Sequence, residues 1–508
     1  MSERWRWALG GAAAAALGLA AFELLAGLLG GPSAIAAIGG VVIDLQPPGA
    51  KDFMVMLFGT NDKLALELMT GAGAILIGAL LGLLARRDVR IATGGFVAFG
   101  LVAFLAALRD PFADPLLTGL LAVVAAVVGV GALYLLLPTP SAPPAVDRAR
   151  RQLLIVGRRA AVLAGGLVVL GGVGAVVGRF LSLQVPAITP PDMTPMPSSS
   201  LPPPPVGSSF DDVAGLTPLI VPNEDFYRID TRLSVPRLQA AGWTVKVSGL
   251  VDSPIELTYE QLAAMALEER WVTIACVSNE VGGDLVGNAK WTGVRLLPLL
   301  ESAGLKPEAT QVVGRSFDGW TAGFPTEHLR GAGAEAMIAL FMNDAPLPPE
   351  HGYPLRLIVP GLYGYVSATK WLSEIELTTW EAFNGYWVPL GWSKTGPILT
   401  QSRIDVPRHG TAVGTGSVVV AGVAWAPTRG ISKVEVQLDE DAWTEAEVTV
   451  PLASTAWVQW KAAVDVPAGG HTIRVRATDG TGALQEERRT PPAPDGARGW
   501  HQVRVLGS

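Results

Sequence analysis

The sequence contains a single cysteine, Cys276, and this scarcity limits the sulfur chemistry that the chain can perform. One thiol cannot form an intrachain disulfide, so the chain suits oxidising and reducing compartments equally. A buried Cys276 among apolar neighbours would be a small core side chain. A thiolate at this position would be a soft metal ligand or a nucleophile.

Histidine is also scarce, and the chain has no basic domain. No apolar run long enough to cross a membrane contains a histidine, which excludes a membrane haem with two histidine ligands, and we expect no haem. The net charge is −7 and no basic stripe is present, so nucleic acid is not an expected partner. The five histidines are His328, His351, His409, His471 and His501.

Long apolar runs are abundant, but only in the first third of the chain. Runs of about 18 or more apolar residues are candidates for transmembrane helices. Two of the candidate runs each contain one acid, Glu23 or Glu67, near a run end, which leaves an interfacial position and an intramembrane role both open. The sequence predicts an all-α transmembrane anchor of about five helices at 1–182. Its runs lie at 7–29, 64–85, 91–108, 115–137 and 160–178.

The charges around these runs predict how the anchor is oriented. Clusters of Arg precede the first run, separate the second from the third, and separate the fourth from the fifth. Because cytoplasmic loops carry excess Lys and Arg, we expect a multi-pass cell-membrane protein with a cytoplasmic N-terminus and an extracytoplasmic remainder. The interrupted segment 33–58 predicts an external loop with short interfacial or re-entrant pieces. Two Arg-Arg pairs, at 150–151 and 158–159, resemble twin-arginine export signals or are ordinary positive-inside charge.

The rest of the chain has the composition of a soluble protein. A proline-rich stretch at 183–209 predicts a semi-rigid linker. Residues 210–406 interleave strands and short helices irregularly, which predicts an α+β domain. Residues 407–508 consist of short alternating strands, which predict a β-sandwich that is immunoglobulin-like in shape without a disulfide. The expected strands lie at 243–249, 271–277, 311–316, 336–342, 355–359, 417–425, 431–438, 456–463 and 471–478, and the expected helices at 258–264, with Thr258 as its N-cap, and 294–303.

Several motifs occur in a fixed order from 221 onward. They are VPNEDFYRID at 221–230, IACVSNEVGGDLVGNAKWTGVRL at 274–296, RSFDGWTAGFP at 315–325 and LPPEHGYPLRLIVPGLYGYVSATKWLSEIEL at 347–377, followed by GYWVPLGW and KTGPILTQSRIDVP. This ordered set resembles the sulfite oxidase family of molybdopterin enzymes over more than half of the chain. The resemblance implies a molybdopterin domain, a C-terminal domain of the dimerisation type with a possible homodimer, and oxygen-atom transfer on a small substrate.

The resemblance also implies roles for individual residues. Cys276 occupies the position whose thiolate binds molybdenum, which suits a soft anionic sulfur. Arg, Lys and exposed backbone N–H groups bind phosphate, while His, Asn and Asp pair with a pterin edge. The implied cofactor-binding residues are Asn223, Phe226, Tyr227, Cys276, Ser316, Asp318, His351, Arg356, Gly364, Ser367, Thr369 and Lys370.

Some of these residues have a plain structural alternative. Cys276 can be a core residue and His351 a turn histidine. Asp318 with the following glycine is by default a turn pair. Lys370 can be a surface lysine. Tyr363 and Tyr365, which lie in the same motif, can be core aromatics.

One segment departs from the sulfite-oxidising members of the family. These members carry arginines a few residues after the metal cysteine, where this chain has Asn279, Glu280 and Val281. Sulfite-like oxidation and sulfoxide-like reduction therefore both stay open. The electrons require a separate carrier, a quinone or a cytochrome, because the sequence offers no haem or iron–sulfur ligands. Substitute cations elsewhere in the chain are Arg228, Arg315 and Arg403.

Two other classes of protein compete with an enzyme. One is a non-catalytic membrane protein that retains the fold without the metal, and the retained Cys276, His351, Arg356 and Lys370 argue against it. The other is a membrane electron-transfer or transport component, because five spans exceed what an anchor needs. Transporters usually show paired repeats and intramembrane polar sites, and neither is evident in this sequence.

Overall fold

The computed structural model describes residues 3–45, 57–58, 62–109, 113–137, 195–233 and 235–508. The chain forms two compact units. The first consists of Met1–Ala187 with Thr231–Val235, and the second of Ile188–Asp230 with Pro236–Ser508. Each unit has a hydrophobic core of its own.

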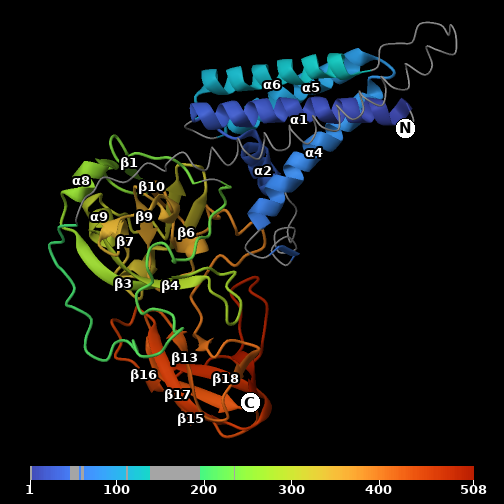
Figure 1. Cartoon of the computed structure of the whole chain (residues 1–508). Helices are drawn as coiled ribbons and strands as arrows, with labels where there is room; N and C mark the ends of the chain where they lie inside the picture. The colour runs from blue at the N-terminus through green and yellow to red at the C-terminus, as the bar shows by residue number, and fades with distance from the viewer. Residues whose placement is uncertain (1–2, 46–56, 59–61, 110–112, 138–194, 234) are drawn as a thin grey trace, which may run out of the picture. The chain divides into compact units, whose positions relative to one another are not determined.

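The first unit is helical where it is described (Figure 1). Four of its helices are long and apolar enough to cross a membrane, and they coincide with the first four predicted runs. The fifth predicted run, at 160–178, lies outside the described residues. A twelve-residue helix, α2, occupies the first part of the segment predicted as a loop, and it is too short to span a bilayer. The helices are α1 (Glu3–Leu29), α2 (Ala34–Leu45), α4 (Asp62–Leu84), α5 (Val89–Ala107) and α6 (Pro115–Leu136).

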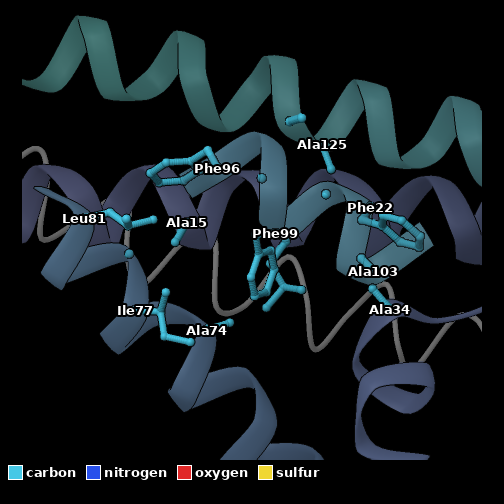
Figure 2. Close-up of a pocket in the computed structure, with 15 residues that line it drawn as sticks. Ala15, Phe22, Ala34, Ala74, Ile77, Leu81, Phe96, Phe99, Ala103 and Ala125 are labelled. Carbon is cyan, nitrogen blue, oxygen red and sulfur yellow. The ribbon is translucent and has the colours of Figure 1, made fainter. Parts of the chain in front are cut away.

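Small residues allow α1 to pack closely against its neighbours. A Cβ atom on Gly11 would overlap the backbone of Gly78 in α4, and one on Gly18 would lie 2.9 Å from the Ala125 carbonyl oxygen of α6. Such close backbone contact is typical of helices that associate in lipid. Between the helices lies a cavity lined by apolar side chains, among them Phe22 of α1 and Phe96 of α5 (Figure 2).

Glu23 is fully buried in this bundle and has a structural partner. Its Oε1 accepts hydrogen bonds from the Ile35 backbone N–H at 3.0 Å and from the Ser33 hydroxyl at 3.2 Å. Both donors lie at the start of α2, where backbone N–H groups lack partners within the helix. The carboxylate therefore ties α1 to the first turn of α2.

The second unit begins with two mixed layers of strands and short helices, in agreement with the predicted α+β organisation. One sheet has the order β2-β1-β10-β5-β6, with β1 and β10 parallel and the other pairs antiparallel. The other has the order β3-β4-β7-β8, and β9 pairs with β7. The strands are β1 (Thr244–Gly249), β2 (Ile255–Thr258), β3 (Glu268–Ala275), β4 (Val286–Arg295), β5 (Gln311–Ser316), β6 (Thr321–Pro325), β7 (Met337–Met342), β8 (Ala345–Pro346), β9 (Arg356–Ile358) and β10 (Leu372–Thr378).

Short helices connect these strands. Thr258 caps α8 as predicted, because its side chain accepts from the Gln261 N–H while the Gln261 side chain accepts from the Thr258 N–H. The predicted helix at 294–303 is shorter, because residues 294–295 belong to β4, a strand that was not predicted. Nearly all of β4 is buried on both faces, so the alternation that marks a half-exposed strand is missing. The helices are α8 (Tyr259–Ala263), α9 (Leu296–Ser302), α10 (Gly364–Ser367) and two 3-10 turns, Thr326–Arg330 and Pro349–His351.

The C-terminal part of this unit consists of two sheets that share one apolar core. The sheets have the orders β11-β13-β17-β16 and β12-β19-β18-β14-β15, and Trp460 of β17 packs in the same cluster as Val434 of β14. The four predicted strands are present, while the short strands and β19 were not predicted. The strands are β11 (Gln401–Val406), β12 (Thr411–Val413), β13 (Gly416–Trp425), β14 (Ile431–Leu438), β15 (Thr444–Glu445), β16 (Glu447–Val448), β17 (Val458–Val466), β18 (Gly469–Asp479) and β19 (His501–Gly507).

Candidate cofactor site

Cys276 directly follows β3 and begins a loop, residues 276–285, that returns into β4; we call it the cysteine loop. The loop is closed at its base, because the Cys276 N–H donates to the Leu285 carbonyl at 2.9 Å and the Leu285 N–H donates to Asn279 Oδ1 at 2.9 Å. Cys276 is partly exposed, and its Sγ lies 2.8 Å from the Ser278 hydroxyl. A thiol held rigidly at a strand end and open on one side is accessible to a ligand.

Two tyrosines are close enough to the thiol to respond to its charge. Burial raises the pKa of the Tyr363 hydroxyl to about 12, and Cys276 adds to this effect. Burial likewise raises the pKa of the Tyr227 hydroxyl, again with a contribution from Cys276, while Arg356 opposes it. Both phenols therefore stay neutral near physiological pH and can donate hydrogen bonds. The charges of Cys276 and Arg356 both act on the Tyr227 hydroxyl, in opposite directions.

Arg356 is a buried cation with incomplete pairing. Its Nη1 donates to the His351 carbonyl at 3.1 Å, and its guanidinium lies 5.4 Å from the centre of the Trp291 ring. Its Nε has no hydrogen-bond partner. Burial lowers the pKa of this guanidinium to about 10. The Trp291 contact was not predicted, although a tryptophan in the cysteine motif was a visible signal.

His351 is buried and neutral, and it presents an unused acceptor. Its Nε2 lies 2.9 Å from the Asn223 carbonyl, so Nε2 carries the proton and Nδ1 is the free acceptor without a partner. Burial lowers the pKa of this imidazole to about 3, and the charges of Arg356 and Lys370 lower it further. The Phe226 ring meets the imidazole edge-on at 5.6 Å and holds its plane.

Lys370 is buried beside a shared carboxylate. Its ammonium donates to the Glu350 carbonyl at 2.8 Å and lies 3.3 Å from Asp230 Oδ2, while Arg228 Nε lies 2.9 Å from the same oxygen. Burial lowers the pKa of Lys370 to about 7, Asp230 opposes this shift, and Arg356 and Arg228 add to it. Sequence reasoning missed Asp230, although this acid ends the first family motif.

We call this group of residues the cradle: Asn223, Arg228, Asp230, His351, Arg356 and Lys370. Within it three cations share one carboxylate; Arg356 and Lys370 are buried, whereas Arg228 is exposed. Buried charges of one sign are destabilising unless they are paired, so the cradle suits a bound anion such as a phosphate group.

The remaining predicted residues fall into three groups. Ser316 and Thr369 are buried with hydroxyl oxygens that lack partners, which leaves them available to a ligand. Gly364 begins α10 where a Cβ would approach the Ala275 carbonyl at 3.8 Å, so α10 lies against the strand end that carries the cysteine. Ser367 and Asp318 make local bonds: Ser367 donates to carbonyls of its own turn, and Asp318 accepts from the Trp320 N–H.

The three arginines considered as substitutes for a substrate anion pocket are all ion-paired. Arg228 pairs with Asp230 at 2.9 Å, and Arg403 pairs with Asp405 at 2.6 Å. Arg315 pairs with Glu376 on β10. Arg315 and Arg403 are therefore each neutralised by a carboxylate, whereas Arg228 shares Asp230 with Lys370.

These residues fit a molybdopterin. The cradle supplies cations and unpartnered atoms for a phosphate and a pterin edge, and the partly exposed thiol suits a soft metal. Within the described part of the chain, no group of three or more His, Cys, Asp or Glu side chains could hold a metal by itself. A metal bound at Cys276 would therefore take most of its ligands from a cofactor.

Comparison with known proteins agrees with this geometry. Residues 232–387 match the family described as "Oxidoreductase molybdopterin binding domain", and residues 397–505 match the "Mo-co oxidoreductase dimerisation domain". The "Uncharacterized oxidoreductase YuiH" of Bacillus subtilis is 37% identical over 161 residues, which cover 32% of this chain and 77% of that protein.

Two longer relatives are more distant. Mitochondrial sulfite oxidase of rat is 27% identical over 338 residues, covering 56% of this chain and 61% of that protein. Nitrate reductase [NADH] 1 of rice is 26% identical over 324 residues, covering 50% of this chain and 35% of that protein. The chain thus spans about three fifths of the length of the rat sulfite oxidase. From its motifs, its site and these matches, the chain belongs to the sulfite oxidase family of molybdopterin-dependent oxidoreductases.

Proposed function

We propose that this protein is a membrane-anchored molybdenum oxidoreductase that transfers an oxygen atom to or from a small molecule. The observation that supports it most is the cradle, in which Arg356 Nε and His351 Nδ1 are buried without partners, while Arg356 and Cys276 both act electrostatically on the buried Tyr227 hydroxyl. A native protein rarely leaves such atoms unpaired without a ligand to bind them. When bound, a molybdenum cofactor supplies two-electron oxygen-atom transfer.

The residues of the site have distinct tasks in this proposal. The Cys276 thiolate is the protein ligand of the metal. Arg356 and Lys370 bind the cofactor phosphate, and His351 accepts a hydrogen bond from the pterin edge, with its tautomer held by the Asn223 carbonyl. The wider set of cofactor contacts consists of Phe226, Tyr227, Ser316, Asp318, Gly364, Ser367 and Thr369.

A neutral substrate fits the site better than sulfite. The cysteine loop carries Asn279, Glu280 and Val281 where an anion would need arginines, and the three substitute arginines are ion-paired. We therefore favour reduction of a neutral oxo compound such as a sulfoxide. That reaction consumes two electrons and two protons and yields a thioether and water. The electrons come from a separate carrier, a quinone or a cytochrome.

The anchor and the assembly complete the proposal. The four apolar helices and the alternating Arg clusters support a membrane anchor at 1–182 with the enzyme domain at 210–406 outside the cytoplasm. The linker covers 183–209. The two-sheet domain at 407–508, of immunoglobulin-like shape, supports a homodimer through its match to the dimerisation family.

Metal analysis of the full chain tests the proposal. The protein would be purified in detergent from a host that makes the cofactor, as wild type and as Cys276→Ala, and its molybdenum and pterin measured. We expect about one molybdenum per wild-type chain and a metal absorbance that changes on mixing with a reductant and then a sulfoxide. A wild type without molybdenum would favour the non-catalytic class. Rapid reduction of the metal by sulfite would overturn the choice of a neutral substrate.

A further inference from the structure

The tip of the cysteine loop is held by the two C-terminal sheets, which begin with β11 and which we call the C-terminal domain. Arg403 of β11 donates from Nη1 to the Gly283 carbonyl at 2.8 Å. His501 of β19 lies directly against Gly282, whose φ is +81° and whose position has no room for a side chain, because a Cβ there would overlap the imidazole. Two residues of the C-terminal domain, about a hundred positions apart in the chain, thus contact two consecutive glycines of the loop.

Arg403 is itself held rigidly. Its Nε pairs with Asp405 at 2.6 Å and its Nη2 donates to the Thr217 hydroxyl at 2.8 Å, so all three guanidinium nitrogens have partners. Thr217 also donates its N–H to the other oxygen of Asp405 at 3.1 Å. A buried guanidinium with a partner for each nitrogen is held in one orientation, so it also restricts the position of the carbonyl group that it binds.

The His501 ring is held in one position against Gly282 and is uncharged. Its Nδ1 accepts from the Ile404 N–H at 3.0 Å, so the proton of the neutral ring is on Nε2. Burial lowers the pKa of the ring to about 4, with further lowering by Arg403, Arg489 and His409 and opposition from Asp405. The ring therefore carries no charge near neutral pH and acts through its shape.

Hydrogen bonds connect the held tip to the cysteine. The Gly283 N–H donates to the Glu280 carbonyl at 2.9 Å, and the Asn279 N–H donates to the Cys276 carbonyl at 3.1 Å. The C-terminal domain also binds β3 just before the cysteine, because the Thr273 N–H donates to the Thr455 carbonyl at 2.9 Å. The backbone is thus attached to the C-terminal domain on both sides of Cys276, at Thr273 before it and at Gly283 after it.

We propose that Arg403 and His501 are positioning residues that fix the direction of the Cys276 thiolate, which makes the C-terminal domain part of the catalytic unit. Partners outside the first ligand shell typically change metal affinity or activity by about 10–100-fold. The inference rests on the proposed function, because the thiolate is taken to bind the metal. The first test of the inference needs no metal, so the inference and the proposed function can fail separately.

The single cysteine makes that first test clean. The full chain, made in a cofactor-deficient host, would be alkylated with iodoacetamide as wild type, Arg403→Gln and His501→Ala. We expect both variants to react about tenfold faster, since each loses a contact that keeps the loop closed. Arg403→Lys, which keeps the charge and one donor, should fall between them and the wild type. The matched control is Arg476→Lys, which alters an arginine ion-paired to Glu435 in the same domain and should react like the wild type.

Equal alkylation rates in Arg403→Gln, His501→Ala and the wild type, with cooperative thermal unfolding preserved, would overturn the proposal. If Arg403→Gln fails to fold, His501→Ala and Arg403→Lys decide by the same criterion. In the molybdenum-loaded chain, the positioning variants should keep the metal content but shift or broaden the Mo(V) electron paramagnetic resonance signal. An unchanged signal contradicts the inference. A wild type without metal contradicts the proposed function and leaves the alkylation result to decide the inference.

Discussion

The two sides of Cys276 are built differently. On the cradle side, Arg356 is buried with an unpaired Nε, Lys370 is buried and shares the Asp230 carboxylate with Arg228, and burial lowers the pKa values of both cations. On the loop side, Arg403 is as buried but has a partner for each nitrogen. The cradle therefore has unused capacity for a ligand, whereas the loop side is complete without one. The comparison separates residues that bind from residues that hold a shape.

The difference also separates what this chain shares with its family from what is its own. The cradle residues lie in the family motifs, so cofactor binding follows the family pattern. The loop after the cysteine departs from sulfite-oxidising members at Asn279, Glu280 and Val281. The nearby Arg403 is engaged with backbone and Asp405 and is not available for a substrate.

The largest effect should come from removing the cradle's cations. Arg356→Gln and Lys370→Met each remove a cation that the proposed function assigns to the cofactor phosphate, and we expect cofactor affinity to fall about 100-fold. Equilibrium dialysis of the released cofactor against each variant would measure this. Arg315→Gln is the matched control, because Arg315 pairs with Glu376 in the neighbouring sheet. If the control loses as much cofactor as the cradle variants, the cradle is not the binding site.

Without a cofactor, Lys370 should destabilise the fold. Its pKa is about 7 when folded, below the ordinary value of 10.5, so protonation opposes folding and stability rises with pH between 7 and 10.5. Lys370→Met should raise the melting temperature of the cofactor-free protein by about 5 °C at pH 6, and the gain should shrink towards pH 10. Differential scanning calorimetry checks this. If the gain in melting temperature does not depend on pH, the charge of the Lys370 ammonium does not destabilise the folded protein.

The two neutral histidines, His351 in the cradle and His501 beside the cysteine loop, should lower the stability of the folded protein in acid. His351 and His501 have folded pKa values of about 3 and about 4, while the unfolded residues bind a proton near 6.5. As pH falls from 6.5 towards 4, each should remove about 1.4 kcal/mol of stability per pH unit. Urea unfolding across this range measures the slope. His351→Gln and His501→Asn should each lower this slope by the contribution of one proton. An unchanged slope would refute the conclusion that these histidines are neutral in the folded protein.

The smallest effect should come from adding charge to the loop side. Glu280 is exposed, so Glu280→Arg should fold normally and place a cation on the cysteine loop. Against sulfite, we expect the KM to fall about fivefold with little change for a sulfoxide, because an exposed charge is screened. Steady-state kinetics with both substrates checks it. A parallel change for the two substrates would show that charge on this loop does not determine specificity.

Local patterns in the sequence were sufficient for several elements. Alternating side chains predicted β14 and β18, and long apolar runs, two of them with one acid each, predicted the four apolar helices. The capping pair of Thr258 and Gln261 likewise appears in a few consecutive residues. These features depend on neighbours along the chain, so their signal is local.

The structure had to supply the elements that depend on distant partners. β4 lacks an alternating pattern because both of its faces are covered, and β15 and β16 have only two residues each. Asp230 is joined to Lys370 across 140 positions. No local pattern records such a contact, which explains why sequence reasoning missed it.

By itself, the sequence determined the family, the candidate metal ligand Cys276 and the cations at Arg356 and Lys370, because short motifs carry these residues in order. Only the tertiary structure decided that the cradle is under-paired and that Arg403 is committed to Gly283, 120 positions away. The physical reason is that pairing and burial are properties of the folded chain. An arginine or lysine has the same letter in the sequence whether its side chain is paired within the protein or lacks a partner.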